Sequence, residues 1–251
     1  MQIDATSELT IVIPAYNEAK RLPRTLEALR AMSSEHRIDV IVVDDGSTDG
    51  TAEAIHDTMV AADGVVIRLE HNVGKGAAVR LGVAHATGRN ILVMDADLAT
   101  DLSCLDRLLD ELERVDVAIG SRAVAGSRVI ESQRIRRIMG RSFNRLARLL
   151  LDLEVADSQC GFKMFRADAA HLLFDLSRVD GFAFDAEILH IASILGLSVR
   201  EVPVTWTAIP ESKVRPVRDS LRTLKELLSI RRDTTPADVW RRARDRGWST
   251  P

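Results

Sequence analysis

Short aliphatic runs alternate with amphipathic segments along the first 120 residues of the chain. The runs are rich in β-branched residues, a pattern typical of parallel strands that are buried on both faces. They cover residues 9–13, 40–43, 65–69, 91–94 and 117–119. Between them, apolar residues recur at helical spacing over residues 20–32, 51–61, 76–86 and 103–113. Repeated strand–helix units predict an α/β fold with a mostly parallel central sheet flanked by helices.

The pattern changes after Ser121. A helix is predicted over residues 132–151, with apolar residues on one side and arginines along the other. These arginines are Arg134, Arg137, Arg141, Arg145 and Arg148. Further segments follow: a turn at 157–161, an amphipathic helix at 183–195, a strand at 199–204, and basic helices at 217–230 and 236–246. We expect one domain over residues 1–232 and a basic C-terminal helical extension over residues 233–251.

Composition allows a large core and argues against nucleic acid as a partner. The 251 residues are 46% hydrophobic and carry a formal net charge of −3, whereas nucleic-acid binding favours a basic protein. The charge is uneven, because eight arginines lie between Arg122 and Arg148 against one acidic residue, Glu131. A local anionic partner for the second half of the chain is compatible with this distribution.

Two cysteines, Cys104 and Cys160, lie far apart in the sequence. We expect both to be free and buried, as in a reducing cytosol. Residues 1–8 are polar and unlike a signal peptide. No apolar run approaches the roughly 20 residues that span a bilayer, so we expect a cytoplasmic protein without a transmembrane segment.

Acidic residues follow three of the predicted strands. Asp95 and Asp97 end the run at 91–94, Asp44 ends the run at 40–43, and Tyr16 and Glu18 follow the first strand. Ligands bind at the carboxyl ends of strands in parallel sheets. Two carboxylates one residue apart suit Mg²⁺ or Mn²⁺ bound to a substrate phosphate. An Asp-rich turn that only caps the next helix is the alternative for this motif taken alone.

Known nucleotide-binding loops are not matched. No G-x-G-x-x-G follows any predicted strand. The segment around Lys75, Asn72-Val73-Gly74-Lys75-Gly76-Ala77, lacks the Ser or Thr that follows the lysine of a P-loop and the required glycine spacing. We therefore do not interpret this segment as a P-loop.

The order of the motifs along the chain is specific. The runs 13–18 and 42–51, together with Asp95-Ala96-Asp97, resemble the inverting GT-A glycosyltransferases of family 2. Further motifs at 120–122, 157–163, 182–187 and 201–213 are similar to dolichyl-phosphate and polyprenyl-phosphate sugar synthases, most closely the β-glucosyltransferase branch. The resemblance covers roughly residues 8–232 and implies a GT-A, or nucleotide-diphospho-sugar transferase, fold.

The resemblance also implies roles for individual residues. Asp95 and Asp97 would hold a diphosphate-bound Mg²⁺ or Mn²⁺, with Ala96 lining the same pocket. The nucleoside would contact Pro14, Tyr16, Glu18, Val42 and Asp44. Phosphates of donor or acceptor would contact Arg122, Arg136, Arg137, Ser142 and Lys213. Asp97, Arg122 and Asp185 would be catalytic, and for Asp185 a general base and an ordering role are equally open.

The resemblance implies inverting, metal-dependent transfer of a hexose, glucose from UDP-glucose, to the phosphate of a polyprenyl or dolichyl phosphate. A GDP-mannose-dependent polyprenyl-phosphate mannose synthase is the alternative within this class. Ala99 and Thr207 weaken it, because related mannosyltransferases often carry Gln or Ser at the first position and Arg at the second. A sugar nucleotidyltransferase and a non-catalytic nucleotide-sugar sensor are alternatives of other classes.

The basic amphipathic helix predicted at residues 132–151 suits an anionic membrane surface. A solvated arginine face is the simpler interpretation. Because the implied acceptor is a lipid phosphate, we expect peripheral attachment to the cytoplasmic face of a membrane through this helix and the C-terminal helices. A homo-oligomer is compatible with the sequence but is not indicated by it.

Overall fold

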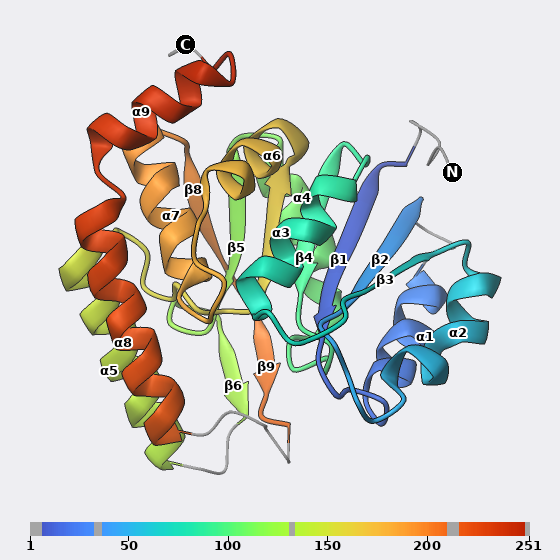
Figure 1. Ribbon diagram of the computed structural model, residues 1–251. Coiled ribbons are helices and arrows are strands. Elements are labelled where there is room, and N and C mark those ends of the chain that lie inside the picture. The colour runs from blue at the N-terminus through green and yellow to red at the C-terminus, as the bar shows by residue number, and fades with distance from the viewer. Residues whose placement is uncertain (1–6, 33–36, 131–133, 210–215, 249–251) are drawn as a thin grey trace.

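A large mixed sheet runs through the centre of the molecule (Figure 1). The computed structural model describes residues 7–32, 37–130, 134–209 and 216–248, with the backbone alone for residues 134–142 and 216–221. The strand order in the large sheet is β3-β2-β1-β4-β7-β5-β8. Its strands are β1 (Leu9–Ala15), β2 (Ile38–Asp44), β3 (Val65–Arg68), β4 (Asn90–Met94), β5 (Val117–Ser121), β7 (Phe162–Arg166) and β8 (Val199–Pro203). A small parallel sheet pairs β6 (Arg128–Ile130) with β9 (Thr205–Thr207).

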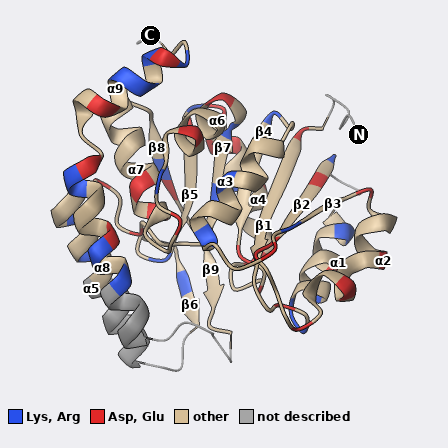
Figure 2. Cartoon of the chain, in the orientation of Figure 1, with Lys and Arg blue, Asp and Glu red and all other residues tan. Residues whose placement is uncertain are grey.

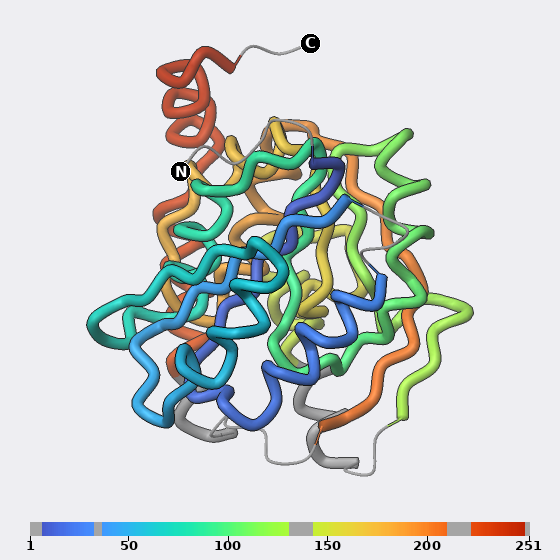
Figure 3. The backbone as a smooth tube through the Cα atoms, turned by 90° about the vertical axis from the view of Figure 1, so that its right-hand side faces the viewer, coloured from blue at the N-terminus to red at the C-terminus, as the bar shows by residue number. Residues whose placement is uncertain are grey.

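Helices cover both faces of the large sheet (Figures 1 and 3). One face packs against α1 (Leu22–Met32), α2 (Thr51–Ala61) and α4 (Leu105–Leu112). The helices on the other side are α3 (Lys75–His85), α5 (Arg134–Leu151), α6 (Ala167–Leu176), α7 (Phe184–Leu195), α8 (Pro216–Asp233) and α9 (Pro236–Asp245). Along β1, the side chains of Ile11 and Ile13 pack on the face covered by α1, α2 and α4, and Val12 packs on the opposite face. Neighbouring side chains of a strand point to opposite faces.

The predicted α/β fold with a mostly parallel sheet is confirmed. The exception is β7, which runs antiparallel between β4 and β5. Neither β7 nor α6 was predicted, and Lys163 explains the missed strand. A lysine within a short run weakens the hydrophobic pattern, yet Lys163 is only 2% exposed and is neutralised by an ion pair with Asp185.

The C-terminal helices form part of the folded body. Leu227 and Ile230 of α8 and Val239 and Ala243 of α9 are buried in the same core cluster as α7. The division into residues 1–232 and 233–251 stays a prediction. Within the described part of the chain, no helix is both long and apolar enough to cross a membrane.

Phe165→Ala tests how much the packing of β7 against α6 contributes to stability. Phe165 is fully buried and packs edge-to-face on Phe174 of α6, with ring centroids 5.5 Å apart. We expect the free energy of unfolding in urea to fall by about 3–5 kcal/mol, because the change leaves a cavity in the core. Phe182→Ala, at a 39% exposed side chain, should cost less than about 1 kcal/mol. Equal losses for both variants would contradict this assignment.

Candidate active site

Three loops meet at the carboxyl edge of the sheet, where β1 lies between β2 and β4. The loop after β1 is bonded to the loop after β2, because Asn17 N donates to Ser47 Oγ at 2.8 Å and Thr48 N donates to Asn17 Oδ1 at 2.8 Å. Thr25 of α1 holds the third loop through a 2.7 Å bond from its Oγ1 to the Ala96 carbonyl oxygen. The sheet and these bonds therefore bring the predicted acidic loops together.

The predicted metal-binding carboxylates are matched by nearby cations. Lys75 Nζ lies 2.6 Å from Asp95 Oδ1, and Arg21 Nη1 lies 3.9 Å from Asp97 Oδ2. Burial and the neighbouring Asp95 charge raise the pKa of Asp97. Burial alone would lower the pKa of Lys75, but the carboxylates of Asp95, Asp185 and Asp97 outweigh it and raise that pKa above its ordinary value. The carboxylates of Asp95 and Asp97 thus create a negative potential here that attracts cations.

The two carboxylates fit a cation that brings its other ligands with it. Among the described residues, no three His, Cys, Asp or Glu side chains are grouped to hold a metal. Mg²⁺ and Mn²⁺ commonly complete their coordination with water and substrate phosphate. One oxygen of Asp97 is already used, because Asp97 Oδ1 accepts a 3.1 Å bond from Ala99 N. Asp95 and Asp97 could therefore hold a metal that arrives with a diphosphate.

Asp44 carries an unsatisfied buried acceptor. Its Oδ1 accepts a 2.9 Å bond from Ser47 N, whereas its buried Oδ2 has no hydrogen-bond partner. Arg68 Nε lies 3.7 Å from Oδ2, and the Arg68 side chain is half exposed. Most buried polar atoms are hydrogen-bonded. Asp44 Oδ2 is therefore an acceptor available to a ligand N–H or O–H if Arg68 shifts.

Asp45 supports the loop instead. Its carboxylate accepts bonds from Val73 N at 2.8 Å, Gly74 N at 3.0 Å and Asn72 Nδ2 at 2.8 Å. These bonds fix the chain immediately before Lys75.

The other predicted nucleoside residues differ in what they can offer. The Tyr16 side chain is 43% exposed, while the Glu18 carboxylate is bound by Arg21, with Nε 2.6 Å from Oε2. Val42 is fully buried and Ala96 nearly so, so their side chains have little surface to offer a ligand. Pro14 is partly exposed.

Arg122 is held by a buried carboxylate. Its Nε and Nη2 lie 2.7 Å and 2.9 Å from the two oxygens of Asp157, and its guanidinium lies over the Trp206 ring at 5.4 Å from the centroid. Burial opposes ionisation of Asp157, but the bonds and charge of Arg122 outweigh it and lower the Asp157 pKa to about 2. Arg122 therefore reaches a phosphate only with the part of its guanidinium that Asp157 leaves free.

Asp185 is also paired. It forms a buried ion pair with Lys163, whose Nζ also donates to the Cys160 carbonyl oxygen at 2.6 Å. One carboxylate oxygen of Asp185 is therefore engaged by a cation inside the protein. The ordering role and the role of general base both stay predictions.

A family model described as glycosyl transferase family 2 matches residues 10–174. The chain belongs to glycosyl transferase family 2. It is 38% identical over 244 residues to a dolichyl-phosphate beta-glucosyltransferase of Mus musculus, with 90% of this chain and 75% of the relative covered. It is 32% identical over 240 residues to a protein of the same description from Dictyostelium discoideum, with 89% and 73% covered.

A solved structure supports the expected fold. The glucosyl-3-phosphoglycerate synthase from Mycobacterium tuberculosis, in complex with Mn²⁺, UDP and glucosyl-3-phosphoglycerate, has a TM-score of 0.68 at 19% identity, covering 90% of this chain and 80% of that chain. The predictions of a GT-A fold and of a glycosyltransferase are confirmed.

Several predicted phosphate-binding residues of this glycosyltransferase lie outside the described part. Lys213 is outside the described residues, as are the side chains of Arg136, Arg137 and Ser142. Their roles stay predictions. Conversely, the sequence interpretation missed Lys75 as a site residue, because its segment was tested only as a P-loop. The glycines on both sides of Lys75 could have indicated its importance, because a glycine lets another backbone segment pack closely against the chain.

The two departures from the mannosyltransferases meet in space. Thr207 N donates to the Ala99 carbonyl oxygen at 2.8 Å, so both positions lie where β9 adjoins the Asp95–Asp97 loop. Ala99 cannot supply the polar side chain, and Thr207 cannot supply the positive charge, that related mannosyltransferases often carry at these positions.

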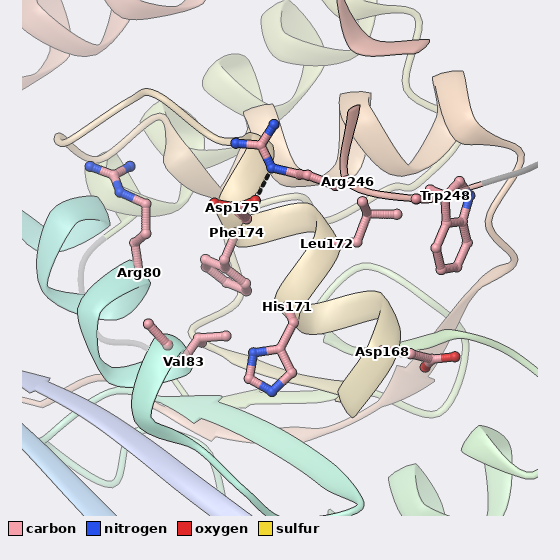
Figure 4. A pocket seen from close by; sticks show the side chains of 11 residues that line it. Arg80, Val83, Asp168, His171, Leu172, Phe174, Asp175, Arg246 and Trp248 are labelled. Carbon is pink, nitrogen blue, oxygen red and sulfur yellow. Dashed lines mark hydrogen bonds and ion pairs between the residues drawn. The ribbon is translucent and has the colours of Figure 1, made fainter. Parts of the chain in front are cut away.

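A separate cleft of about 510 Å³ opens between α3, α6 and the segment after α9 (Figure 4). Its charged side chains are engaged in internal pairs, Arg246 with Asp175 and Arg80 with Asp180. None of the strand-end carboxylates lines it. We assign the chemistry to the carboxyl edge of the sheet, because that is where the unmatched acceptor and the carboxylate pair lie.

Both cysteines are free and buried, as predicted. Burial raises the pKa of Cys104 to about 12 and that of Cys160 to about 11. Both thiols are thus protonated and poor nucleophiles at neutral pH.

The Asp157 pKa predicts a loss of stability in acid. The folded pKa of about 2 lies below the ordinary 3.8, so the stabilisation is complete above about pH 4 and is lost as the pH falls toward 2. We expect a contribution of about 2 kcal/mol, measured as the free energy of unfolding against pH. Asp157→Asn should flatten this slope and exposed Asp168→Asn should not. An unchanged slope in Asp157→Asn would refute the prediction.

Proposed function

We propose that this glycosyltransferase moves glucose from UDP-glucose to the phosphate of dolichyl phosphate or another polyprenyl phosphate, with inversion and with Mg²⁺ or Mn²⁺. The observation that carries the proposal is the carboxyl edge itself. Asp95 and Asp97 lie there beside Lys75, and the orphaned Asp44 Oδ2 belongs to an adjacent loop. One edge therefore offers a place for a diphosphate with its cation and a separate acceptor for a nucleoside.

The names of the relatives support both substrates. The Mus musculus and Dictyostelium discoideum relatives are dolichyl-phosphate beta-glucosyltransferases. The Mycobacterium tuberculosis neighbour has been solved with Mn²⁺ and UDP-glucose. Ala99 and Thr207 favour glucose over the GDP-mannose alternative for the reason given above.

The chemistry follows from the charges at this edge. A bound Mg²⁺ or Mn²⁺ supplies Lewis-acid neutralisation of the charge that develops on the leaving diphosphate. Asp95 and Asp97 are the residues that would hold this cation, and Lys75 adds a positive charge beside them. Their geometry is set before the reaction by the bonds between the three loops, so little reorganisation is needed when the glycosidic bond breaks.

The acceptor needs orientation more than deprotonation. A phosphate monoester is anionic at neutral pH and can attack the anomeric carbon from the face opposite the leaving group, which inverts the configuration. No carboxylate has to remove a proton in this step. The Lys163–Asp185 ion pair is consistent with this, because it leaves Asp185 to order the pocket.

The outer surface of α5 and α8 suits an anionic membrane. Arg145 and Arg148 on α5 and Lys225 on α8 are exposed, as are Leu149, at 72%, and Leu228, at 50%. Basic side chains with interspersed large apolar ones are typical of helices that lie on lipid surfaces. Figure 2 shows α5 and α8 side by side along one flank.

The basic residues of α9 are less available to a membrane. Arg241 and Arg242 pair with Asp238 of the same helix, and Arg244 Nε donates to the Trp240 carbonyl oxygen at 3.3 Å. Arg246, directly after α9, pairs with Asp175. We therefore place the membrane contact on α5 and α8 rather than on α9.

A transfer assay tests the function. We expect radiolabelled UDP-glucose, Mg²⁺ and polyprenyl phosphate to yield label in the organic phase, in a β-linked glucosyl phosphate identified by NMR. Label from GDP-mannose alone would assign the alternative donor. Label from neither donor would refute a polyprenyl-phosphate sugar synthase.

A pair of matched variants distinguishes loss of the cation site from a general loss of structure. Asp97→Asn should lower turnover by roughly 100-fold or more, the effect of losing one group that stabilises charge in the transition state. Asp101→Asn should retain activity, because Asp101 caps the short turn at Leu102–Cys104 through Ser103 N at 2.9 Å and Asn caps equally well. Full activity of Asp97→Asn would contradict the cation site.

Vesicle binding tests the membrane surface. Arg145→Gln with Arg148→Gln should weaken binding to phosphatidylserine vesicles roughly 30-fold, at about 1 kcal/mol for each basic residue. The control pair, Arg241→Gln with Arg244→Gln on α9, should bind as the unmodified chain does. Sedimentation with vesicles at low and moderate salt is the measurement. Equal binding of all variants to the phosphatidylserine vesicles, or equal binding of the unmodified chain to uncharged vesicles, would exclude an electrostatic contact.

A further inference from the structure

The loop at residues 177–183, between α6 and α7, seats the first turn of α3. The Asp180 carbonyl oxygen accepts bonds from Gly76 N at 2.8 Å and Ala77 N at 3.4 Å. A Cβ on Gly74 would overlap that oxygen, and a Cβ on Gly76 would overlap the Val179 carbonyl oxygen. The backbone on both sides of Lys75 is therefore packed directly against this loop.

Two carboxylates, the buried Glu187 and the partly buried Glu226, hold the loop from outside it. Glu187 of α7 accepts bonds from Arg178 N at 3.0 Å and Val179 N at 2.9 Å. Glu226 of α8 accepts a 3.0 Å bond from Ala183 N, although the two residues are 43 positions apart in the sequence. A Cβ on Gly181 would overlap the Glu226 carboxylate, so this carboxylate lies directly against the loop backbone.

The position of Glu226 is itself fixed. Its side chain is 17% exposed, and Arg222 Nε one helical turn earlier lies 3.1 Å from Oε1. The Ala183 bond uses the other oxygen, Oε2. Both carboxylate oxygens thus have partners, which holds the side chain in one orientation against the loop.

We propose that Glu226 is a positioning residue for the donor pocket. It holds the 177–183 loop, the loop carbonyls seat Gly76 and Ala77, and this seating sets Lys75 against Asp95. That the pocket takes UDP-glucose rests on the proposed function above; the mechanical link from α8 to Lys75 does not. The helix that borders the proposed membrane surface is in this way coupled to the diphosphate end of the site.

Donor kinetics test the link. Glu226→Ala should raise the KM for UDP-glucose roughly tenfold, the fold-change expected from loss of a charge-assisted hydrogen bond, while the KM for polyprenyl phosphate stays within about twofold. Glu226→Gln should recover most of the donor affinity, because its amide oxygen can still accept from Ala183 N. Asp233→Asn, at an exposed carboxylate of α8 that pairs with Arg232, is the matched control and should be unchanged.

A double-mutant cycle distinguishes positioning from general destabilisation. Gly181→Ala should raise the donor KM by pushing the Glu226 carboxylate away. In the Glu226→Ala background the added methyl has room, so Gly181→Ala should add little there and the double variant should match Glu226→Ala alone. Multiplying effects would show that the two changes act independently and would overturn the proposal.

Amide hydrogen exchange tests the link without catalysis. Glu226→Ala should speed exchange at Gly76 and Ala77, while exchange in β1 and β4 stays as in the unmodified chain. Unchanged exchange at Gly76 and Ala77 would overturn the proposal, as would an acceptor KM that rises with the donor KM. A chain that transfers no sugar but shows the local exchange change would refute the proposed function and leave the positioning role of Glu226 supported.

Discussion

The arrangement of this protein depends on neutralising carboxylates at the carboxyl edge of the sheet. Removing one member of a buried ion pair costs about 3–5 kcal/mol, because the other charge is left uncompensated. Lys163 and Asp185 form a pair that is buried on both sides, and the buried Asp157 is met by the partly exposed Arg122. The Lys75–Asp95 pair is more exposed, so less of this cost applies to it. The protein can therefore concentrate negative charge where a cation is needed and still fold without one.

These cations also decide what each predicted residue is free to do. Asp185 and Arg122 were assigned to catalysis by resemblance, and both turn out to be engaged by a partner inside the protein. Asp44 differs, because its Oδ2 accepts no hydrogen bond and has only the half-exposed Arg68 at 3.7 Å. Chemical availability therefore differs among residues that a motif treats alike.

Sequence patterns predicted the parallel strands and the acidic loops because these are local features. An aliphatic run such as residues 91–94 signals a buried strand by itself, and Asp95 and Asp97 follow it directly. The strand β7 could not be recognised in this way, since burial of Lys163 depends on Asp185, 22 residues away. The contact between Lys75 and Asp95 depends in the same way on how α3 is seated by a loop from another part of the chain. Pairings between distant segments are a property of the fold, and no local spacing reports them.

The antiparallel course of β7 has a consequence for how this architecture can diversify. On one side of β7 lie β3, β2, β1 and β4, and the proposed nucleotide and cation residues belong to β1, β2 and β4 and the loops that follow them. On the other side lie β5 and β8. Gly161, directly before β7, lies against the Asp95 carboxylate. The strand β7 therefore forms the boundary between these two groups of strands. Under the proposed function, changes around β5 and β8 that leave the contact of Glu226 with the 177–183 loop intact would alter what receives the sugar while the donor residues keep their geometry. Such a division would let the architecture acquire new acceptors without rebuilding the site that activates the donor.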